Sequence, residues 1–246
     1  MSFPHTNSQS FQTTRWTWVV QLRDGAEEAE RERILAELCG AYWSPLYGFA
    51  RRSGKSPHDA EDATQGFLHH VLRANLFAKA QQARGRLRTF LLTSFKHYLA
   101  SQHQRETAAK RGGREPPLSL DMPHAEIRYQ SEPLDLATPE DLYNRRWARD
   151  FFVSVKERLK SEYEASGKAK IFESLQPWLF VEAKAEAFMS QAQSLNVSEG
   201  NFRIMLVRFR KRYRELFREA VADTLNSPTQ EEIELEIREL IRLGAG

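Results

Sequence analysis

The chain of 246 residues contains one cysteine, Cys39, and no long apolar run. A single cysteine cannot form an internal disulfide or a cysteine-rich zinc site, and its apolar, helix-like surroundings predict a small core side chain. No apolar segment approaches the ~20 residues of a membrane span, and the polar start MSFPHTNSQS lacks a signal-peptide core. We therefore expect a cytoplasmic protein that does not enter a membrane.

Sequence patterns for catalysis are also missing. There is no glycine-rich phosphate loop and no nucleophile elbow. Histidines and acids between residues 58 and 70 suggest a metal site, but Asp62 and His69 are about two helical turns apart. No Glu-x-x-His or His-x-x-x-His pair occurs to bring two ligands onto one helix face. We expect no metal, no cofactor and no enzymatic activity.

Alternating strand patterns of useful length are absent, whereas apolar residues recur at three-to-four spacing along most of the chain. The sequence therefore predicts an all-α fold. Ser56 followed by Pro57, and Thr138 followed by Pro139, are typical helix starts, and Pro45 should kink the helix that contains it. Helices are expected near Trp16, over 27–52, from 57, from 86, from 139, over 171–178, 182–194, from 199 and over 230–243.

Charge is divided unevenly along the chain, although the formal net charge is only +3. Residues 84–114 hold eight Lys/Arg and one acid, and residues 115–141 hold seven acids and one base. The second stretch is rich in proline and has no period, which predicts an acidic, flexible linker between two helical domains. The expected parts are a first domain (1–111), the linker (112–138), a second domain (139–226) and an acidic C-terminal helix (227–246).

The stretch 195–218 combines a tight turn with a strongly basic helix. Asn196 can end the preceding helix in a left-handed conformation, and Ser198 can cap a helix that starts at Glu199. Seven Lys/Arg and one acid lie between Arg203 and Arg218. The apolar positions form one expected core face: Phe202, Met205, Leu206, Phe209, Tyr213, Leu216 and Phe217.

A helix, a short turn and a basic helix together are typical of a helix-turn-helix that enters the major groove of DNA. The alternative reading is the solvated face of an ordinary amphipathic helix. The DNA-binding hypothesis assigns the contacts to Ser198, Asn201, Arg203, Val207, Arg208, Lys211, Arg212 and Arg214.

Two earlier helices carry further polar surfaces. The helix after Gly85 mixes aromatic, imidazole and cationic side chains, which suits single-stranded nucleic acid but also fits ordinary helix surface. Its candidate residues, with the two cations that follow, are Phe90, Lys96, His97, His103, Arg105, Lys110 and Arg111. The helix from Pro57 has Ala60, Ala63, Phe67 and Val71 as its expected core face. An outward acidic stripe is expected at Asp59, Glu61, Asp62, Gln65 and His69.

Three segments in this order resemble a bacterial sigma factor of the sigma-70 family, extracytoplasmic-function (ECF) type. HDAEDATQGFLHHVL resembles region 2.2, FLLTSFKHYLASQHQR resembles regions 2.3 and 2.4, and FMSQAQSLNVSEGNFRIMLVRFRKRYREL resembles the helix-turn-helix of region 4.2. The chain departs from the usual pattern at Gly66, Ser101, Ser190, Gln191, Asn201 and Ile204.

This resemblance implies a dissociable RNA polymerase subunit that selects promoters. The expected partner is core RNA polymerase, through its clamp helices and its flap, and the acidic stripe would dock the clamp helices. The basic aromatic helix would hold the melted −10 strand, and the Arg203 helix would read the −35 element of promoter DNA. Whether an anti-sigma factor or another regulator binds the chain is left open.

A stand-alone, dimeric helix-turn-helix transcription regulator is the alternative function. The helix-turn-helix fits that alternative equally well. The first domain distinguishes the two functions, because a stand-alone regulator has no need of both a docking stripe and a stacking helix.

Overall fold

The computed structural model describes residues 27–73, 86–108, 126, 129–130, 138–181 and 185–244. The helix expected near Trp16, the cations Lys110 and Arg111, and most of the linker lie outside these residues. The elements are α2 (Glu28–Arg52), α3 (Pro57–Arg73), α5 (Leu87–Ala108), α7 (Pro139–Ala165), α8 (Ala169–Leu175), the 3₁₀ helix η2 (Gln176–Trp178), α9 (Ala185–Ser194), α10 (Glu199–Asp223) and α11 (Gln230–Gly244). The described part is all-α, with one isolated antiparallel bridge between Arg86 and Leu225.

Helix starts follow the predicted capping residues. The Thr138 side chain accepts a hydrogen bond from the Asp141 amide, and the Asp141 carboxylate accepts one from the Thr138 amide, which forms a capping box. Ser56 accepts from the Asp59 amide at 3.1 Å. Pro57 and Pro139 occupy first helical positions, where no hydrogen-bonding amide is needed. These capping predictions are confirmed.

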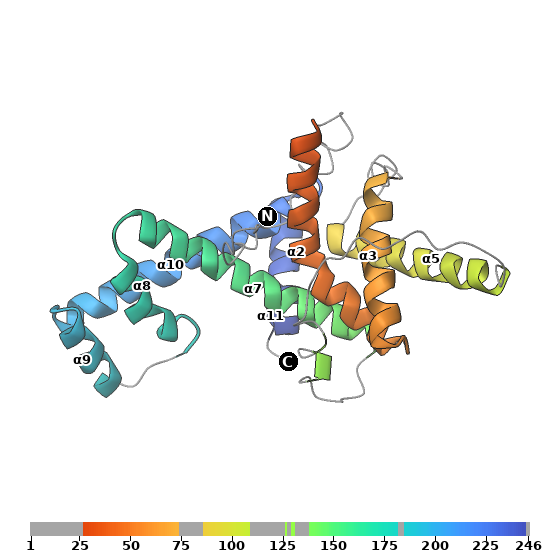
Figure 1. Cartoon of the computed structure of the whole chain (residues 1–246). Helices are drawn as coiled ribbons and strands as arrows, with labels where there is room; N and C mark the ends of the chain where they lie inside the picture. Colours follow the sequence, from red (N-terminus) through yellow and green to blue (C-terminus); the bar gives the residue numbers. More distant parts are fainter. Residues whose placement is uncertain are drawn as a thin grey trace, which may run out of the picture.

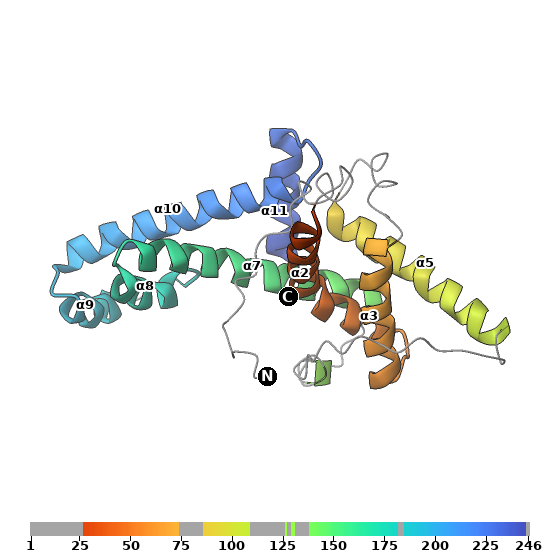
Figure 2. The same cartoon turned by 45° about the horizontal axis from the view of Figure 1, so that its top comes forward.

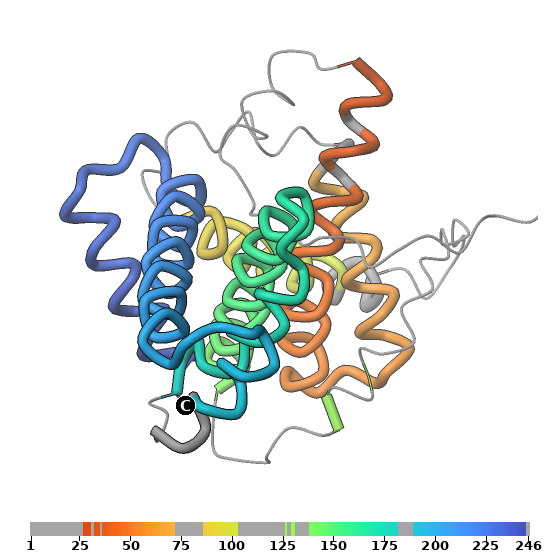
Figure 3. Tube along the Cα trace, turned by 90° about the vertical axis from the view of Figure 1, so that its left-hand side faces the viewer, coloured from red at the N-terminus to blue at the C-terminus, as the bar shows by residue number. Residues whose placement is uncertain are grey.

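Helix α7 is the central element, lying between α2 on one side and α10 on the other (Figure 3). The Trp147 ring of α7 stacks on the Phe151 ring, with their centroids 5.0 Å apart. The centroid of the Tyr42 ring of α2 lies 6.4 Å from that of Trp147. On the opposite side, Phe151 meets Phe217 of α10 edge-on at 5.3 Å. The buried side chains before and after the predicted linker therefore belong to one hydrophobic cluster. The division into two domains stays a prediction.

Helices α2, α3 and α5 pack at one end of the molecule, whereas α8, α9 and the start of α10 form the other end (Figures 1 and 2). Phe95 of α5 lies 5.0 Å from Phe67 of α3 and 6.0 Å from Phe49 of α2, measured between ring centroids. A Cβ atom at Gly66 would come within 2.5 Å of the Tyr98 hydroxyl, so the glycine permits this close approach of α5.

Pro45 lies inside α2, which continues through it to Arg52. Figure 1 shows the α2 ribbon changing direction along its length, which fits the predicted kink. Cys39 is buried in this helix, and burial raises the pKa of its thiol to about 12. Among the described residues, none of the helices has the length and apolar character needed to cross a membrane.

Candidate nucleic-acid interface

The turn between α9 and α10 has the predicted backbone. Asn196 has φ +54°, in the left-handed region, and the Val197 amide donates to the Ala192 carbonyl at 3.0 Å, which closes the end of α9. Ser198 is extended and its hydroxyl accepts from the Asn201 amide at 3.2 Å. The direction of α10 is therefore fixed by local interactions at its first residue, Glu199.

The buried face of α10 matches the predicted core face. Six of its seven expected residues are buried, and Met205 is half-buried. Phe209 anchors the face, because its ring meets Tyr163 of α7 at 5.4 Å and Phe172 of α8 at 5.7 Å, both edge-on. Aromatic contacts of this kind add to the free energy of burial. The opposite face of α10 is thereby held away from the core.

The exposed face carries a continuous row of side chains, which we name the α10 stripe: Ile204, Val207, Arg208, Lys211 and Arg214. Ile204 is 52% exposed and Val207 62% exposed, so this face presents two aliphatic side chains to solvent beside its cations. Arg208 and Arg214 form no ion pair or hydrogen bond with any residue that the structure describes. Lys211 is only loosely paired, with its Nζ 4.0 Å from Glu215. These cations are available to a polyanion.

Arg203 and Arg212 of α10 are held by acids of the chain itself, whereas Arg210 donates to the backbone carbonyls of Trp178 and Val181. Arg203 lies 2.6 Å from Glu199, one turn earlier on the same helix. Arg212 donates from two nitrogens to Glu162 of α7, at 2.9 and 2.8 Å, and these bonds hold the pKa of the Glu162 carboxyl below its usual value. Arg212 is thus directed towards α7, and Arg203 must leave Glu199 to meet a base.

Helix α5 presents less free surface than predicted. Phe90 packs half-buried against the core, and Lys96 is paired with Glu140 of α7 at 2.7 Å. His97 is exposed as predicted. The α5 backbone includes His103 and Arg105, but their side chains lie outside the described part, as do Lys110 and Arg111.

The predicted acidic stripe of α3 needs one correction. Asp59 and Glu61 are exposed, and Asp62 is partly exposed with an oxygen 3.3 Å from His58 Nδ1. Gln65, predicted to point outward, is buried. The prediction assumed one core face, but α2 and α5 both pack on α3, so its buried arc is wider than one stripe.

His69, the last residue of that stripe, is half-buried. Among the described residues the Gln65 side-chain nitrogen has no hydrogen-bond partner. The exposed acidic surface of α3 is therefore concentrated at its first two turns.

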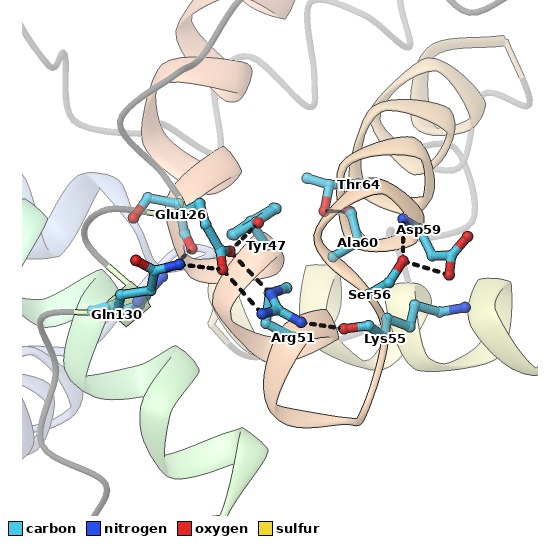
Figure 4. A network of polar contacts seen from close by, with 11 residues as sticks. Tyr47, Arg51, Lys55, Ser56, Asp59, Ala60, Thr64, Glu126 and Gln130 are labelled. Carbon is cyan, nitrogen blue, oxygen red and sulfur yellow. Dashed lines mark hydrogen bonds and ion pairs between the residues drawn. The ribbon is translucent and has the colours of Figure 1, made fainter.

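Glu126 of the predicted linker makes a contact that the charge pattern did not indicate. Its carboxylate accepts two hydrogen bonds from Arg51 of α2, both at 3.0 Å, and a further one from the Tyr47 hydroxyl (Figure 4). The Arg51 guanidinium also lies 4.9 Å from the centroid of the Tyr129 ring. The bonds from Arg51 hold the pKa of the Glu126 carboxyl below its usual value.

Glu126 and Tyr129 of the predicted linker are therefore attached to α2, and Tyr129 also lies under Arg146 of α7, so this part of the stretch is not a solvated linker. The sequence signal for it is weak: one acid and one aromatic residue in a stretch with no period.

No group of three or more His, Cys, Asp or Glu side chains in the described ranges could hold a metal ion. The described arrangement defines an all-α protein with a helix-turn-helix and an exposed apolar and cationic stripe on its second helix. Comparisons with protein-family models, with curated proteins and with solved structures each found no match.

Proposed function

We propose that the chain is a promoter-specific transcription initiation factor, an ECF-type sigma factor that binds core RNA polymerase and recognises −10 and −35 promoter DNA. This role would place it in the cytoplasm with the polymerase. Catalysis of RNA synthesis would belong to the polymerase, and the chain would supply binding and selectivity.

The α10 stripe is the observation that carries this proposal. A helix that follows a capped tight turn and exposes two aliphatic side chains beside free cations suits the major groove. Ile204 and Val207 suit the methyl groups of thymine, while Arg208 suits a guanine edge. Lys211 and Arg214 lie one to two turns further along the helix and suit phosphates, which position a protein without reading sequence.

The polymerase-docking role falls to the exposed acids of α3. Asp59 and Glu61 project into solvent, and Asp62 lies beside them. Acidic side chains on a rigid helix suit a basic partner surface, because complementary charge speeds association and fixes the register. This assignment agrees with the resemblance of the same segment to region 2.2.

The −10 role falls to α5, where His97 is exposed and Lys96 is held by Glu140. Release of Lys96 from its carboxylate partner would free a cation for the phosphates of the melted strand. Strand capture by this helix therefore requires a local exchange of ion-pair partners.

Gel filtration with core polymerase, followed by run-off transcription, tests the function. We expect co-elution with the core enzyme and transcription that depends on the added chain. An Asp62→Arg variant should lose co-elution while keeping its circular dichroism spectrum, because it sets like charge against a basic partner. Glu32→Arg, at an exposed acid of α2, is the matched control.

A chain that elutes as a dimer, binds duplex DNA alone and ignores the core enzyme would be the stand-alone regulator instead. Unchanged polymerase affinity in Asp62→Arg would remove the docking assignment.

A further inference from the structure

Glu199 is the first residue of α10, and it is the one acid in the sequence between residues 199 and 209. The start of α10 lies beside α9 at one end of the molecule, away from α2, α3 and α5 (Figures 1 and 2). A helix-turn-helix directs this end of its second helix at base edges. Under the proposed function, the Glu199 carboxylate therefore faces DNA, which carries charge of the same sign.

Glu199 holds Arg203, one turn later on the same helix. Its Oε1 atom accepts hydrogen bonds from Arg203 Nε at 3.0 Å and from Arg203 Nη2 at 2.6 Å. Both side chains stay open to solvent, with 36% of Glu199 and 53% of Arg203 exposed. Ion pairs between exposed side chains contribute little to the stability of a fold. The two side chains can therefore exchange each other for new partners at a small cost.

A phosphate group satisfies only one half of this pair. Arg203 must leave Glu199 to meet DNA, and the carboxylate then lies against the duplex without its partner. The free amides at the start of a helix attract a phosphate, whereas the Glu199 carboxylate at the same place repels it. Glu199 therefore opposes contacts between this end of α10 and the sequence-independent backbone of DNA.

A G·C base pair satisfies both halves of the pair. In the major groove guanine offers two acceptors, N7 and O6, which suit the Arg203 guanidinium. Its cytosine offers the N4 amino group, which suits a carboxylate. An A·T pair offers an amino donor but lacks the two neighbouring acceptors of guanine. The exchange of partners is therefore complete at G·C and incomplete at A·T or at a phosphate.

We propose that Glu199 is a specificity-determining residue of α10, which opposes phosphate contacts by Arg203 and accepts a hydrogen bond from the N4 amino group of cytosine when Arg203 meets a guanine. The inference rests on the proposed function, because it requires the first turns of α10 to enter the major groove. It adds an acid to a set of expected DNA contacts whose other members are polar, aliphatic or cationic.

The first test measures the selectivity of holoenzyme made with the full chain. One duplex carries the upstream element that the parent prefers, and an unrelated duplex of equal length is the competitor. The ratio of the two affinities is the readout. Glu199→Ala should tighten the unrelated duplex and weaken the preferred one, so the ratio should fall about tenfold, which is the discrimination of one good base contact.

Glu215→Ala is the matched control, because it removes one exposed acid from the same helix beyond the expected base contacts, where the acid pairs with Lys211 and Arg212. It should tighten both duplexes alike and keep the ratio of the parent. If Glu199→Ala also keeps the ratio of the parent, the inference is overturned.

The second test removes single groups from the DNA. At the G·C pair whose selection is relaxed by Arg203→Ala, cytosine is replaced by 2-pyrimidinone, which lacks the N4 amino group. The parent should bind this duplex about fivefold or more weakly than the unmodified one. The Glu199→Ala variant should bind the two duplexes equally, which controls for the weaker base pairing of the modified duplex. Equal binding of both duplexes by the parent would overturn the cytosine contact.

Failure of the inference and failure of the proposed function give different results. A selective parent whose affinity ratio survives Glu199→Ala overturns the role of Glu199 and leaves the proposed function intact. A parent chain that does not join core polymerase, or whose holoenzyme binds the preferred and unrelated duplexes equally, overturns the proposed function and the inference with it.

Discussion

The two helices predicted to meet nucleic acid differ in how much of their polar surface the rest of the chain already uses. Helix α10 buries one apolar face and adds exposed ion pairs to α7 and α11 through Arg212 and Arg218, but Arg208 and Arg214 of the α10 stripe have no partner among the described residues. Helix α5 is attached through rings in its middle and through buried ion pairs at its start, and Lys96 is paired as well. A helix that packs through apolar side chains keeps its charged side chains available to a partner, whereas a helix that packs through ion pairs has its charged side chains already paired.

The largest expected effect concerns the apolar attachment of α10. Phe209→Ala should lower the free energy of unfolding by about 3–5 kcal/mol, because it leaves a cavity beside Tyr163 and Phe172. Urea unfolding followed by circular dichroism measures this change. Val207→Ala, on the exposed face, should change stability by no more than about 0.5 kcal/mol. Similar losses in both variants would contradict the assignment of the two faces.

The ionic attachment of α5 comes next. Arg88→Met should cost about 3 kcal/mol of unfolding free energy, because the buried Glu236 loses one of its two arginine partners and keeps only Arg86. Adding Glu236→Leu should recover part of that loss, since the under-compensated buried charge is then removed. A double-mutant cycle by urea unfolding measures the coupling. Additive losses would mean that the pair does not hold α5.

A smaller effect is expected at the turn that directs α10. Ser198→Ala should cost about 1 kcal/mol, because the Asn201 amide loses its acceptor. Ser194→Ala is the control, since that hydroxyl only donates to a carbonyl of its own helix. Thermal unfolding should rank Ser198→Ala as the less stable variant. If Ser194→Ala were the less stable variant, Ser198 would not be the residue that caps α10.

The smallest effect is the pH response of the Arg212–Glu162 pair. The folded chain holds the pKa of Glu162 below its ordinary 4.5, so the stabilisation is present above pH 4.5 and is lost as the pH falls through the lower folded value. The pair is about one third exposed, so the loss should stay below about 1 kcal/mol. Glu162→Gln should reduce the difference in unfolding free energy between pH 6 and acid conditions. An unchanged difference would exclude a contribution from this pair.

Most of the helical framework could be predicted from the sequence, because its signals are local. The turn at Asn196, the caps at Ser56, Thr138 and Ser198, and the core face of α10 each depend on residues a few positions apart. Local periodicity and hydrogen-bonding side chains determine such features, so they can be predicted without knowing which other helices pack nearby.

The contacts between distant segments could not be predicted in this way. The sequence gives no sign that Glu236 differs from the other acids of its helix. It can be buried because Arg86 and Arg88, from a distant part of the chain, pair with it. Gln65 was placed outward for the same reason, since a single helix pattern does not reveal a second packing neighbour. The partners of Lys96 and Arg212 likewise depend on where α7 lies.

Base reading by the first turns of α10 is the central claim, and a promoter library with a randomised upstream element tests it most directly. Transcription by holoenzyme is measured for the parent and three alanine variants. Arg203→Ala and Arg208→Ala should each relax selectivity at one preferred base pair, by about 1–3 kcal/mol. Lys211→Ala should weaken all promoters about equally and flatten the salt dependence by about one unit.

That contrast follows from position along the helix, since base edges are reached by its first three turns and phosphates by the later ones. The account predicts different patterns for the two groups of variants. If all three variants lower transcription uniformly and keep the parent's preferred sequence, α10 does not read bases through these arginines, and the central claim is wrong.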